Sequence, residues 1–492
     1  MTISALLMTI YLFLVAGLAL YGFNALLLSG LFLWHRRRAC DVPALGEWPS
    51  VTVQLPIFNE RFVVERLIDS VASLDYPPDK LSIQVLDDST DETKTLARAR
   101  VTYFQARGVN MTYLRRKERL GFKAGALAFG LAVAPGDFIA VFDADFCPPP
   151  DFLRRMMPHF TDPAVGMVQA RWGHLNAEYS ALTRAQALAL DGHFIVEQTA
   201  RSRARLLLNF NGSAGVWRRE CIEDAGGWQA DTVAEDLDLS YRAQLSGWQL
   251  RYLPDVVAPA EVPPLLTAFK RQQFRWAKGS IQCLCKLRSR LLRSSLSPWR
   301  KVQGLLHISG YLIHPLMLAL VLVGLPVVFA CNPGTLPLSA LGLAGFAPPV
   351  VFALSQWAVY PDWRRRFAYF PILVLLGAGV ALNNTWAVFE AFLGRNPTLF
   401  LRTPKFQAEG RDAGRVGHAG SYSLPVDWTT WGELVLALYC LVEAIVAFSR
   451  APGLAPFLVT YAAGYAYTAG LALWQSWRTV RPRAIRSEVE AW

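Results

Sequence analysis

Two pairs of acidic residues each follow a short apolar run of the kind that forms a β-strand. Asp143 and Asp145 stand two residues apart after the run 138–142. Carboxylate oxygens in this arrangement suit Mg²⁺ or Mn²⁺, and such a cation can clamp a diphosphate. Asp87 and Asp88 follow an earlier run and could bind a base or a ribose, or simply turn the chain. Asp-x-Asp triplets are common, so it is the position after a strand that favours a metal site here.

Two further motifs carry side chains suited to phosphate and sugar chemistry. Lys123 lies at the start of a predicted helix, where it could offset phosphate charge or simply be exposed. A helix through Gln-Gln-Phe-Arg-Trp would place Gln272, Arg275 and Trp276 on one side. An Arg can meet a diphosphate and a Trp face can stack on a sugar ring. The alternative is an amphipathic interfacial helix whose Trp lies among lipid headgroups.

The elements that must position these residues alternate between strand and helix. We expect strands at 51–55, 82–86, 111–114 and 138–142, and helices at 62–74, up to about 107, and at 125–133. Such alternation predicts a parallel sheet with helices on both faces. In that architecture, ligands bind at the carboxyl ends of the strands, which is where both acidic pairs lie.

Apolar residues are strongly segregated along the chain. The chain is 53% hydrophobic and only 18% charged, against about 25% charged residues in a typical globular protein. Charge-free runs long enough to cross a bilayer lie at 3–34, 304–330, 335–361, 367–389 and 451–476, and the run 434–449 contains only Glu443. The region 35–300, by contrast, mixes charges with short apolar runs.

This pattern predicts three parts. They are an N-terminal transmembrane helix at 1–34, a polar catalytic domain at 35–300 with interface helices near 262–300, and a C-terminal membrane domain at 301–492. Within the membrane domain we expect spans near 304–330, 335–361, 431–449 and 454–477, an interface or re-entrant segment at 367–393, and a loop at 394–428.

Basic residues predict the orientation. Arg36, Arg37 and Arg38 follow the first span, and positive residues stay in the cytoplasm, so the polar domain is expected to be cytoplasmic, at a bacterial inner membrane or a plasma membrane. Five crossings keep the later basic segments on that side as well. Ten basic residues between Lys270 and Lys301 favour contact with anionic headgroups. The net charge of +11 therefore indicates a lipid bilayer and an anionic substrate, with no nucleic acid as partner.

The order of the motifs resembles that of membrane-integrated family 2 glycosyltransferases, such as cellulose synthases, hyaluronan synthases and plant cellulose-synthase-like mannan and glucan synthases. The shared motifs, over roughly 45–300, are Asp87-Asp88, Asp143-x-Asp145, Glu235-Asp236 and Gln272-x-x-Arg275-Trp276. A later run, Phe400–Lys405, resembles the Phe-x-Val-Thr-x-Lys gating loop of cellulose synthases, with Arg402 in place of Val. The resemblance implies an α/β, GT-A-like nucleotide-sugar-binding domain with a mostly parallel sheet, plus a helical transmembrane domain.

The resemblance also implies a role for each matching residue. The residues that would bind the nucleotide sugar are Asp87, Asp88, Lys123, Asp143 and Arg275. The metal ion, Mg²⁺ or Mn²⁺, would lie on Asp145 with Asp143, and Asp236 would be the general base. The residues that would meet the acceptor are Glu235, Gln272 and Trp276, and those of the gating-like loop are Phe400, Arg402, Thr403 and Lys405. Ala234 stands where the family usually has Thr, so one hydrogen bond is missing from the pattern.

The function implied is inverting, metal-dependent transfer of a hexose from UDP-glucose or GDP-mannose to a growing β-linked polysaccharide, with translocation across the membrane. The alternative is a glycolipid transferase that adds one sugar to ceramide or diacylglycerol, which needs the same chemistry but no polymer channel. A third possibility, from a different class, is a transporter or scaffold with an inactive transferase domain. The intact Asp145, Asp236 and Arg275 argue against that class, and export partners are not predictable from the chain.

Overall fold

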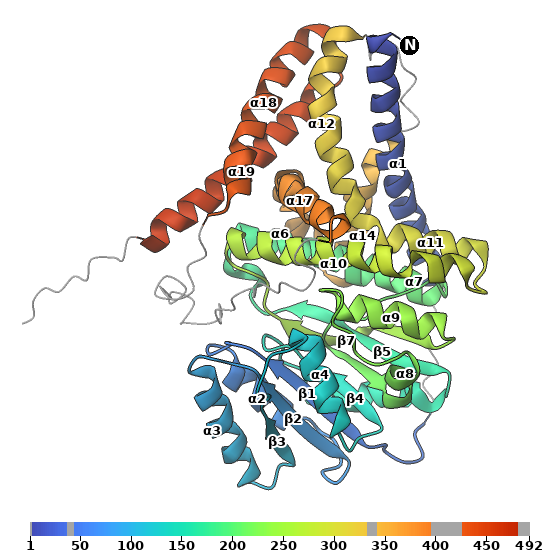
Figure 1. The fold of residues 1–492 in the computed structure, drawn as a ribbon, viewed down its shortest axis with the longest axis vertical. Helices are drawn as coiled ribbons and strands as arrows, with labels where there is room; N and C mark the ends of the chain where they lie inside the picture. Colours follow the sequence, from blue (N-terminus) through green and yellow to red (C-terminus); the bar gives the residue numbers. More distant parts are fainter. Residues whose placement is uncertain (1, 37–43, 332–341, 395–425, 481–492) are drawn as a thin grey trace, which may run out of the picture.

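The computed structural model describes residues 2–36, 44–331, 342–394 and 426–480. Three layers follow one another along its long axis (Figure 1). A β-sheet with its covering helices forms one end of the molecule. A layer of helices that includes α6 (Ala181–Asp191), α10 (Leu266–Arg293) and α11 (Pro298–Ile308) lies across the sheet domain. The upright helices that rise from this layer are α1 (Ile3–His35), α12 (Ile313–Ala330), α18 (Trp428–Arg450) and α19 (Ala455–Val480).

The sheet has seven strands in the order β3-β2-β1-β4-β6-β5-β7. The strands are β1 (Val51–Ile57), β2 (Leu81–Asp87), β3 (Met111–Leu114), β4 (Phe138–Val141), β5 (Val165–His174), β6 (Gly215–Arg218) and β7 (Gln249–Ala260). Strand β6 runs antiparallel to both of its neighbours, and the other pairs are parallel. The predicted α/β fold with a mostly parallel sheet is confirmed, and each of the four predicted strands is present.

Apolar and polar residues alternate along β1, and the two kinds face opposite sides of the sheet. Its apolar residues face the core formed with α2 (Val64–Ala72) and α3 (Thr93–Gln105). Its polar residues are buried on the opposite face, where Thr52 bonds Ser82 at 2.8 Å and Gln54 bonds Gln84 at 3.0 Å. Buried polar groups are stable when they are paired in this way. Helix α4 covers this second face.

Short helices complete the sheet domain. They are α4 (Phe122–Ala132), α5 (Phe152–Met156), α8 (Arg219–Asp224) and α9 (Glu235–Leu245). The helices expected at 62–74, up to 107 and at 125–133 correspond to α2, α3 and α4, with ends that differ by a few residues.

The middle layer consists of two long helical segments and one shorter helix. The first runs through α6 (Ala181–Asp191), a π-helical turn η3 (Gly192–Gln198) and α7 (Thr199–Arg203). The second is α10 (Leu266–Arg293), followed by α11 (Pro298–Ile308). Helix α10 lies within the region 262–300, where interface helices are predicted, and α11 begins at the end of that region. Helix α10 lies between the sheet domain and the upright helices (Figure 1).

Three helices of the described segments are long and apolar enough to cross a membrane. They are α1 (Ile3–His35), the continuous helix Gly310–Ala330 that contains α12 (Ile313–Ala330), and α18 (Trp428–Arg450). Helices α14 (Ala347–Val359) and α19 (Ala455–Val480) lie in the other two predicted spans but do not meet both criteria. The five crossings therefore stay a prediction.

The segment predicted to lie at the interface or to be re-entrant is a bent pair of helices. Helix α15 (Trp363–Phe367) and helix α16 (Phe370–Gly379) form its first arm, and α17 (Ala381–Phe392) forms the second, at 43° to the first. A bend of this kind is typical of a broken span or a re-entrant segment. Most of the gating-like loop, including Phe400 to Lys405, lies outside the described residues.

Two buried lysines of α10 join the sheet domain to the helices above it. Lys270 Nζ lies 2.8 Å from Glu433 Oε1 and 3.2 Å from Asp427 Oδ1, at the start of α18. Lys278 Nζ lies 3.0 Å from Glu390 Oε2 of α17. The side chains of Lys270 and Glu433 are 2% and 0% exposed, so neither charge can turn to water.

Replacing Lys270 by Met should therefore destabilise the protein strongly. The substitution keeps most of the side-chain volume but leaves Glu433 buried without a cation, and breaking a buried pair on one side costs about 3–5 kcal/mol. Thermal and denaturant unfolding of the purified protein in detergent micelles would measure the loss.

The control is Lys80→Met, which removes an exposed pair with Glu47 and should change the stability little, because exposed ion pairs contribute little. Adding Glu433→Leu to Lys270→Met should recover much of the stability, because no unpaired buried carboxylate then remains at that position. Equal losses for Lys270→Met and Lys80→Met would contradict a stabilising role for the buried pair.

Candidate active site

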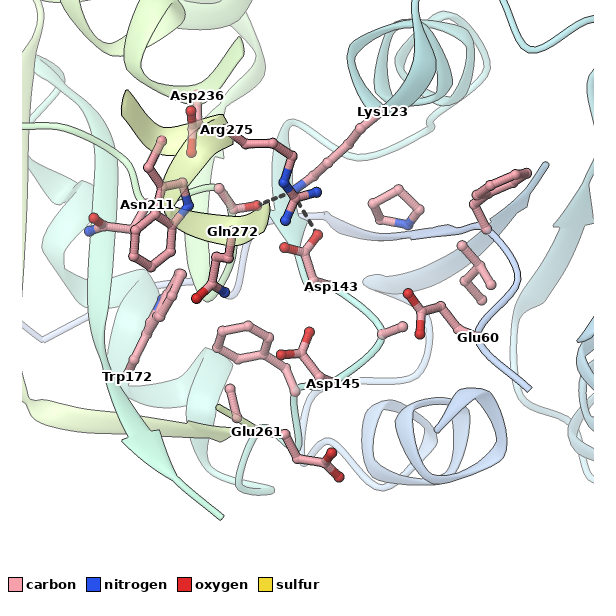
Figure 2. Close-up of a pocket in the computed structure, with 18 of the residues that line it drawn as sticks. Glu60, Lys123, Asp143, Asp145, Trp172, Asn211, Asp236, Glu261, Gln272 and Arg275 are labelled. Atoms are coloured by element: carbon pink, nitrogen blue, oxygen red, sulfur yellow. Dashed lines mark hydrogen bonds and ion pairs between the residues drawn. The ribbon is translucent and has the colours of Figure 1, made fainter. Parts of the chain in front are cut away.

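A cavity of about 210 Å³ opens where β1 and β4 end and where α4 and α9 begin. Helix α10 covers one side of it. Nine predicted site residues line the cavity: Asp88, Lys123, Asp143, Asp145, Glu235, Asp236, Gln272, Arg275 and Trp276. Figure 2 shows most of them converging on one space from different elements. The fold thus brings together motifs that are almost 190 residues apart in the chain.

Lys123 is the centre of the charged groups. Its ammonium lies 2.6 Å from Asp143 Oδ1 and 3.7 Å from Glu235 Oε1, and it donates a hydrogen bond to the Gly212 carbonyl at 2.8 Å. Burial alone would lower the pKa of Lys123, but Asp143, Glu235 and Asp236 raise it further than burial lowers it. The lysine therefore stays charged and holds the ends of β4 and α9 together (Figure 2).

The two acidic residues that begin α9 have unusual electrostatics. Burial, followed by repulsion from Glu235, raises the pKa of Asp236 to about 7, while Lys123 opposes the shift. Burial also raises the pKa of Glu235, again against Lys123. Asp236 Oδ1 accepts a hydrogen bond from the Leu237 N–H at 2.7 Å, which fixes its carboxylate at the start of the helix. A carboxyl group whose pKa lies near neutrality is suited to take a proton.

Small residues set the distance between α9 and α10. Ala234 is the N-cap of α9 and makes no side-chain capping bond, which agrees with the missing Thr of the family pattern. A Cβ added to Gly279 of α10 would lie 2.5 Å from the Ala234 Cβ. This close approach allows Gln272, Arg275 and Trp276 to reach the cavity from the same helix, as the spacing predicts.

Arg275 is a half-buried cation on the α10 side of the cavity. Burial lowers the pKa of Arg275, while Asp143 and Glu235 act in the opposite direction. In Figure 2 its guanidinium lies close to Asp143, near the end of Lys123. Lys123 pairs with Asp143, and Arg275 is attracted to the same carboxylate from another element, so the two cations form a site for an anion such as a diphosphate.

The structure separates the predicted pair Asp87 and Asp88. Asp88 lines the cavity, and Arg116 binds both of its carboxylate oxygens, with Nε at 3.0 Å from Oδ1. Asp87 is buried behind it, accepts hydrogen bonds from the Ser89 N–H and the Tyr113 hydroxyl, and does not line the cavity. Burial, together with Asp87, raises the pKa of Tyr113 to about 12. Only Asp88 is placed to touch a bound nucleotide directly.

Asp145 and Asp143 are the residues that could hold a divalent cation. Both face the cavity in Figure 2, but Asp143 is already paired with Lys123. Within the described ranges, no three His, Cys, Asp or Glu residues come together in a geometry that would hold a metal ion. Two carboxylates fit Mg²⁺ or Mn²⁺ when ligand phosphates and water supply the other oxygens, which is the usual arrangement for a phosphate-bound cation.

Several residues that line the cavity were missed by the sequence analysis. They are Glu60 after β1, Trp172 and His174 on β5, Asn211 before β6, and Glu261 after β7. Trp172 is fixed by a hydrogen bond from its indole N–H to the Ser213 carbonyl at 3.3 Å and by an edge contact with Phe146. The same rule that found Asp143, polar or aromatic residues at a strand end, would have found Trp172 and Glu261 had β5 and β7 been predicted.

Comparisons with known proteins agree with this geometry. Residues 49–279 match the family model described as glycosyltransferase like family 2. Glucomannan 4-beta-mannosyltransferase 1 of Oryza sativa subsp. japonica is 41% identical over 299 residues, which cover 57% of each chain. Glucomannan 4-beta-mannosyltransferase 2 of Arabidopsis thaliana is 42% identical over 263 residues, covering 52% of this chain and 49% of the relative. The chain thus spans about half the length of the curated relatives it matches.

One solved structure is similar over a larger share of the chain. A mannosyltransferase of Pyrobaculum calidifontis, in complex with GDP-Man and Mn²⁺, has a TM-score of 0.54 and 25% identity. The similarity covers 79% of this chain and 100% of that chain. The predicted GT-A-like character of the sheet domain is thereby confirmed.

Replacing Lys123 by Met should destabilise the protein in a pH-dependent way. The variant leaves Asp143, Glu235 and Asp236 close together without their cation, and such a loss costs about 3–5 kcal/mol. A group whose pKa is raised by folding favours the folded state at acidic pH, and that contribution is lost as pH rises through the folded pKa. The pKa of Asp236 is already raised to about 7, so the cost should be largest above neutrality.

Unfolding midpoints of Lys123→Met and the unmodified protein, measured in acidic and alkaline buffer, would check this expectation. Lys94→Met on the exposed side of α3 is the control and should show no such dependence. A loss for Lys123→Met that is the same at both pH values would show that repulsion among the carboxylates is not its cause.

Proposed function

We propose, from the premise that residues 49–279 are a family 2 glycosyltransferase domain, that the chain transfers a hexose from a nucleotide sugar to a β-linked polysaccharide. The observation that carries the proposal is the convergence of Lys123, Asp143, Asp236 and Arg275 on one cavity. The cavity therefore holds cations that can bind a leaving diphosphate, together with a base for an attacking hydroxyl.

The donor we propose is GDP-mannose. The relatives that match the catalytic region are named as mannosyltransferases, and the similar solved structure holds GDP-Man with Mn²⁺. The sequence analysis left UDP-glucose open as well, and glucose remains the competing sugar in the test below. Bound Mg²⁺ or Mn²⁺ would be held by Asp145 and Asp143 and would neutralise charge on the diphosphate.

The residues of the chain then perform the remaining steps. Arg275 and Lys123 are placed to bind the diphosphate and stabilise the charge that develops as it leaves. Asp236 accepts the proton of the acceptor hydroxyl, which must come within about 3 Å of its carboxylate. Attack on the face opposite the leaving diphosphate converts an α-linked donor into a β-linked product. No covalent bond to the protein forms.

The membrane helices extend the proposal to the product. Helix α10 contributes Gln272 and Trp276 to the cavity and is joined to α17 and α18 through buried ion pairs. We therefore propose an integral membrane enzyme, with the catalytic domain in the cytoplasm, that elongates a polysaccharide processively and passes it across the bilayer.

The first test is incubation of the purified protein with labelled GDP-mannose or UDP-glucose and Mn²⁺. We expect a high-mass, mannanase-sensitive product from GDP-mannose and much less incorporation from UDP-glucose. A single chloroform-extractable product would instead support transfer to one lipid. The absence of any donor turnover would overturn the proposed function.

Asp236→Asn should abolish most transfer while the donor still binds. A positioned general base typically contributes about 10²–10⁴-fold to rate, and the amide cannot take a proton. Turnover and donor binding by calorimetry would be measured together, with the exposed Asp255→Asn as the matched control. Undiminished turnover in Asp236→Asn would remove Asp236 from the role of base.

The pH dependence of kcat should reflect the raised pKa of Asp236. The base must be deprotonated, so kcat should fall as pH drops below about 7. The Glu235 carboxylate raises the pKa of Asp236, so Glu235→Gln should move the acidic limb of the profile to lower pH even if it reduces the maximum rate. An acidic limb that moves to higher pH in Glu235→Gln would contradict this electrostatic account.

A further inference from the structure

The long helix beneath the membrane helices is interrupted by the π-helical turn η3, between α6 and α7. π-helical turns are rare and frequently occur at functional sites. Here the turn presents His193 and Glu197 together, with His193 Nδ1 at 3.0 Å from Glu197 Oε2. The proposed mechanism assigns no role to this pair.

A chain of polar contacts leads from this pair to the cavity. The His193 Nε2 atom lies 3.1 Å from Asn211 Oδ1, and Asn211 lines the cavity. The amide nitrogen of Asn211 is buried and has no hydrogen-bond partner among the residues that the structure describes. That nitrogen is a donor for which the described part of the chain supplies no acceptor, which points to a ligand oxygen.

Asn211 also lies next to the base. A Cβ added to the adjacent Gly212, whose φ is +82°, would lie 2.8 Å from Asp236 Oδ2. In Figure 2, Asn211 and Gln272 form the side of the cavity opposite Glu60. A ligand whose hydroxyl contacts Asp236 would therefore have other atoms within reach of Asn211.

The side chain of Glu197 is only partly buried and carries a charge. Burial would raise its pKa, but Arg201, at 2.9 Å, and His193 hold the pKa of Glu197 well below its usual range, so it is ionised. The side chains of His193 and Glu197 nevertheless remain 29% and 30% exposed. The turn η3 packs against both β5 and α1, so the pair of His193 and Glu197 lies between the sheet domain and the upright helices.

The charge of the pair decides which ligand fits. An ionised Glu197 repels a diphosphate, whereas Lys123 and Arg275, which line the cavity, attract one. A carboxylate, an imidazole and an amide next to one another suit the hydroxyl groups of a neutral sugar. The ligand is therefore expected to be the acceptor and not the donor.

We propose that His193, Glu197 and Asn211 form a binding site for hydroxyl groups of the acceptor saccharide, which holds its terminal sugar against Asp236. This inference rests on the proposed function and adds to it the residues that select and orient the acceptor. Arg201 is a positioning residue, because it fixes Glu197 from the side away from His193.

The test uses the full-length protein in detergent or nanodiscs, with GDP-mannose as donor and mannohexaose as acceptor. His193→Ala and Glu197→Gln should raise the KM for mannohexaose roughly tenfold or more, as expected for the loss of hydrogen bonds to a charged group. The KM for GDP-mannose and the slow hydrolysis of GDP-mannose without acceptor should stay within about twofold. The exposed Glu223→Gln on α8 is the matched control.

Asn211→Ala is the second variant, because it leaves the buried pair of Glu197 and Arg201 intact if Glu197→Gln fails to fold. An unchanged KM for mannohexaose in His193→Ala and Asn211→Ala would overturn the inference, as would an equal rise in the KM for both substrates. If the unmodified protein neither hydrolyses GDP-mannose nor transfers mannose, the proposed function fails first. An active unmodified protein with unaffected variants refutes only the acceptor site.

Discussion

One ammonium group, that of Lys123, makes the arrangement of this site possible. Lys123 comes from the start of α4, Asp143 from the end of β4, and Glu235 and Asp236 from the start of α9. Three carboxylates enclosed so closely would repel one another, and the lysine provides the charge that offsets them. Its third contact, to the Gly212 carbonyl, also fixes the loop that leads into β6. The positions of α4, β4 and α9 thus depend on one cation.

Helix α10 transmits this arrangement to the rest of the molecule. Arg275 reaches the carboxylates from one side of the helix, while Lys270 and Lys278 are paired with acidic residues of the upper helices. These pairs are buried, so α10 cannot slide without separating charges in a region of low dielectric. The sheet domain and the upright helices are therefore positioned relative to one another by the same helix that carries part of the site.

The fold and much of the site could be predicted because they depend on local patterns. Apolar runs followed by Asp143 or Asp88 indicate strand ends, and the spacing of Gln272 and Arg275 indicates one side of a helix. Contacts that depend on long-range packing could not be predicted, among them the pairing of Lys270 with Glu433 and the place of Asn211 beside His193. Asp87 and Asp88 show what a local pattern cannot predict. Strand β2 ends at Asp87, so the two adjacent carboxylates have different partners, Tyr113 for Asp87 and Arg116 for Asp88.

The charges around the proposed reaction site give it a direction. Lys123 and Arg275 line the cavity and suit a diphosphate, whereas the ionised Glu197 of η3, which is linked to the cavity through His193 and Asn211, does not. Asp236 lies beside Gly212, the neighbour of Asn211, with a pKa near 7 because burial and Glu235 outweigh Lys123. In the proposed arrangement the acceptor approaches along Asn211 and η3, and η3 packs against α1. A product that leaves by the same route would move toward the upright helices, as the proposed export requires.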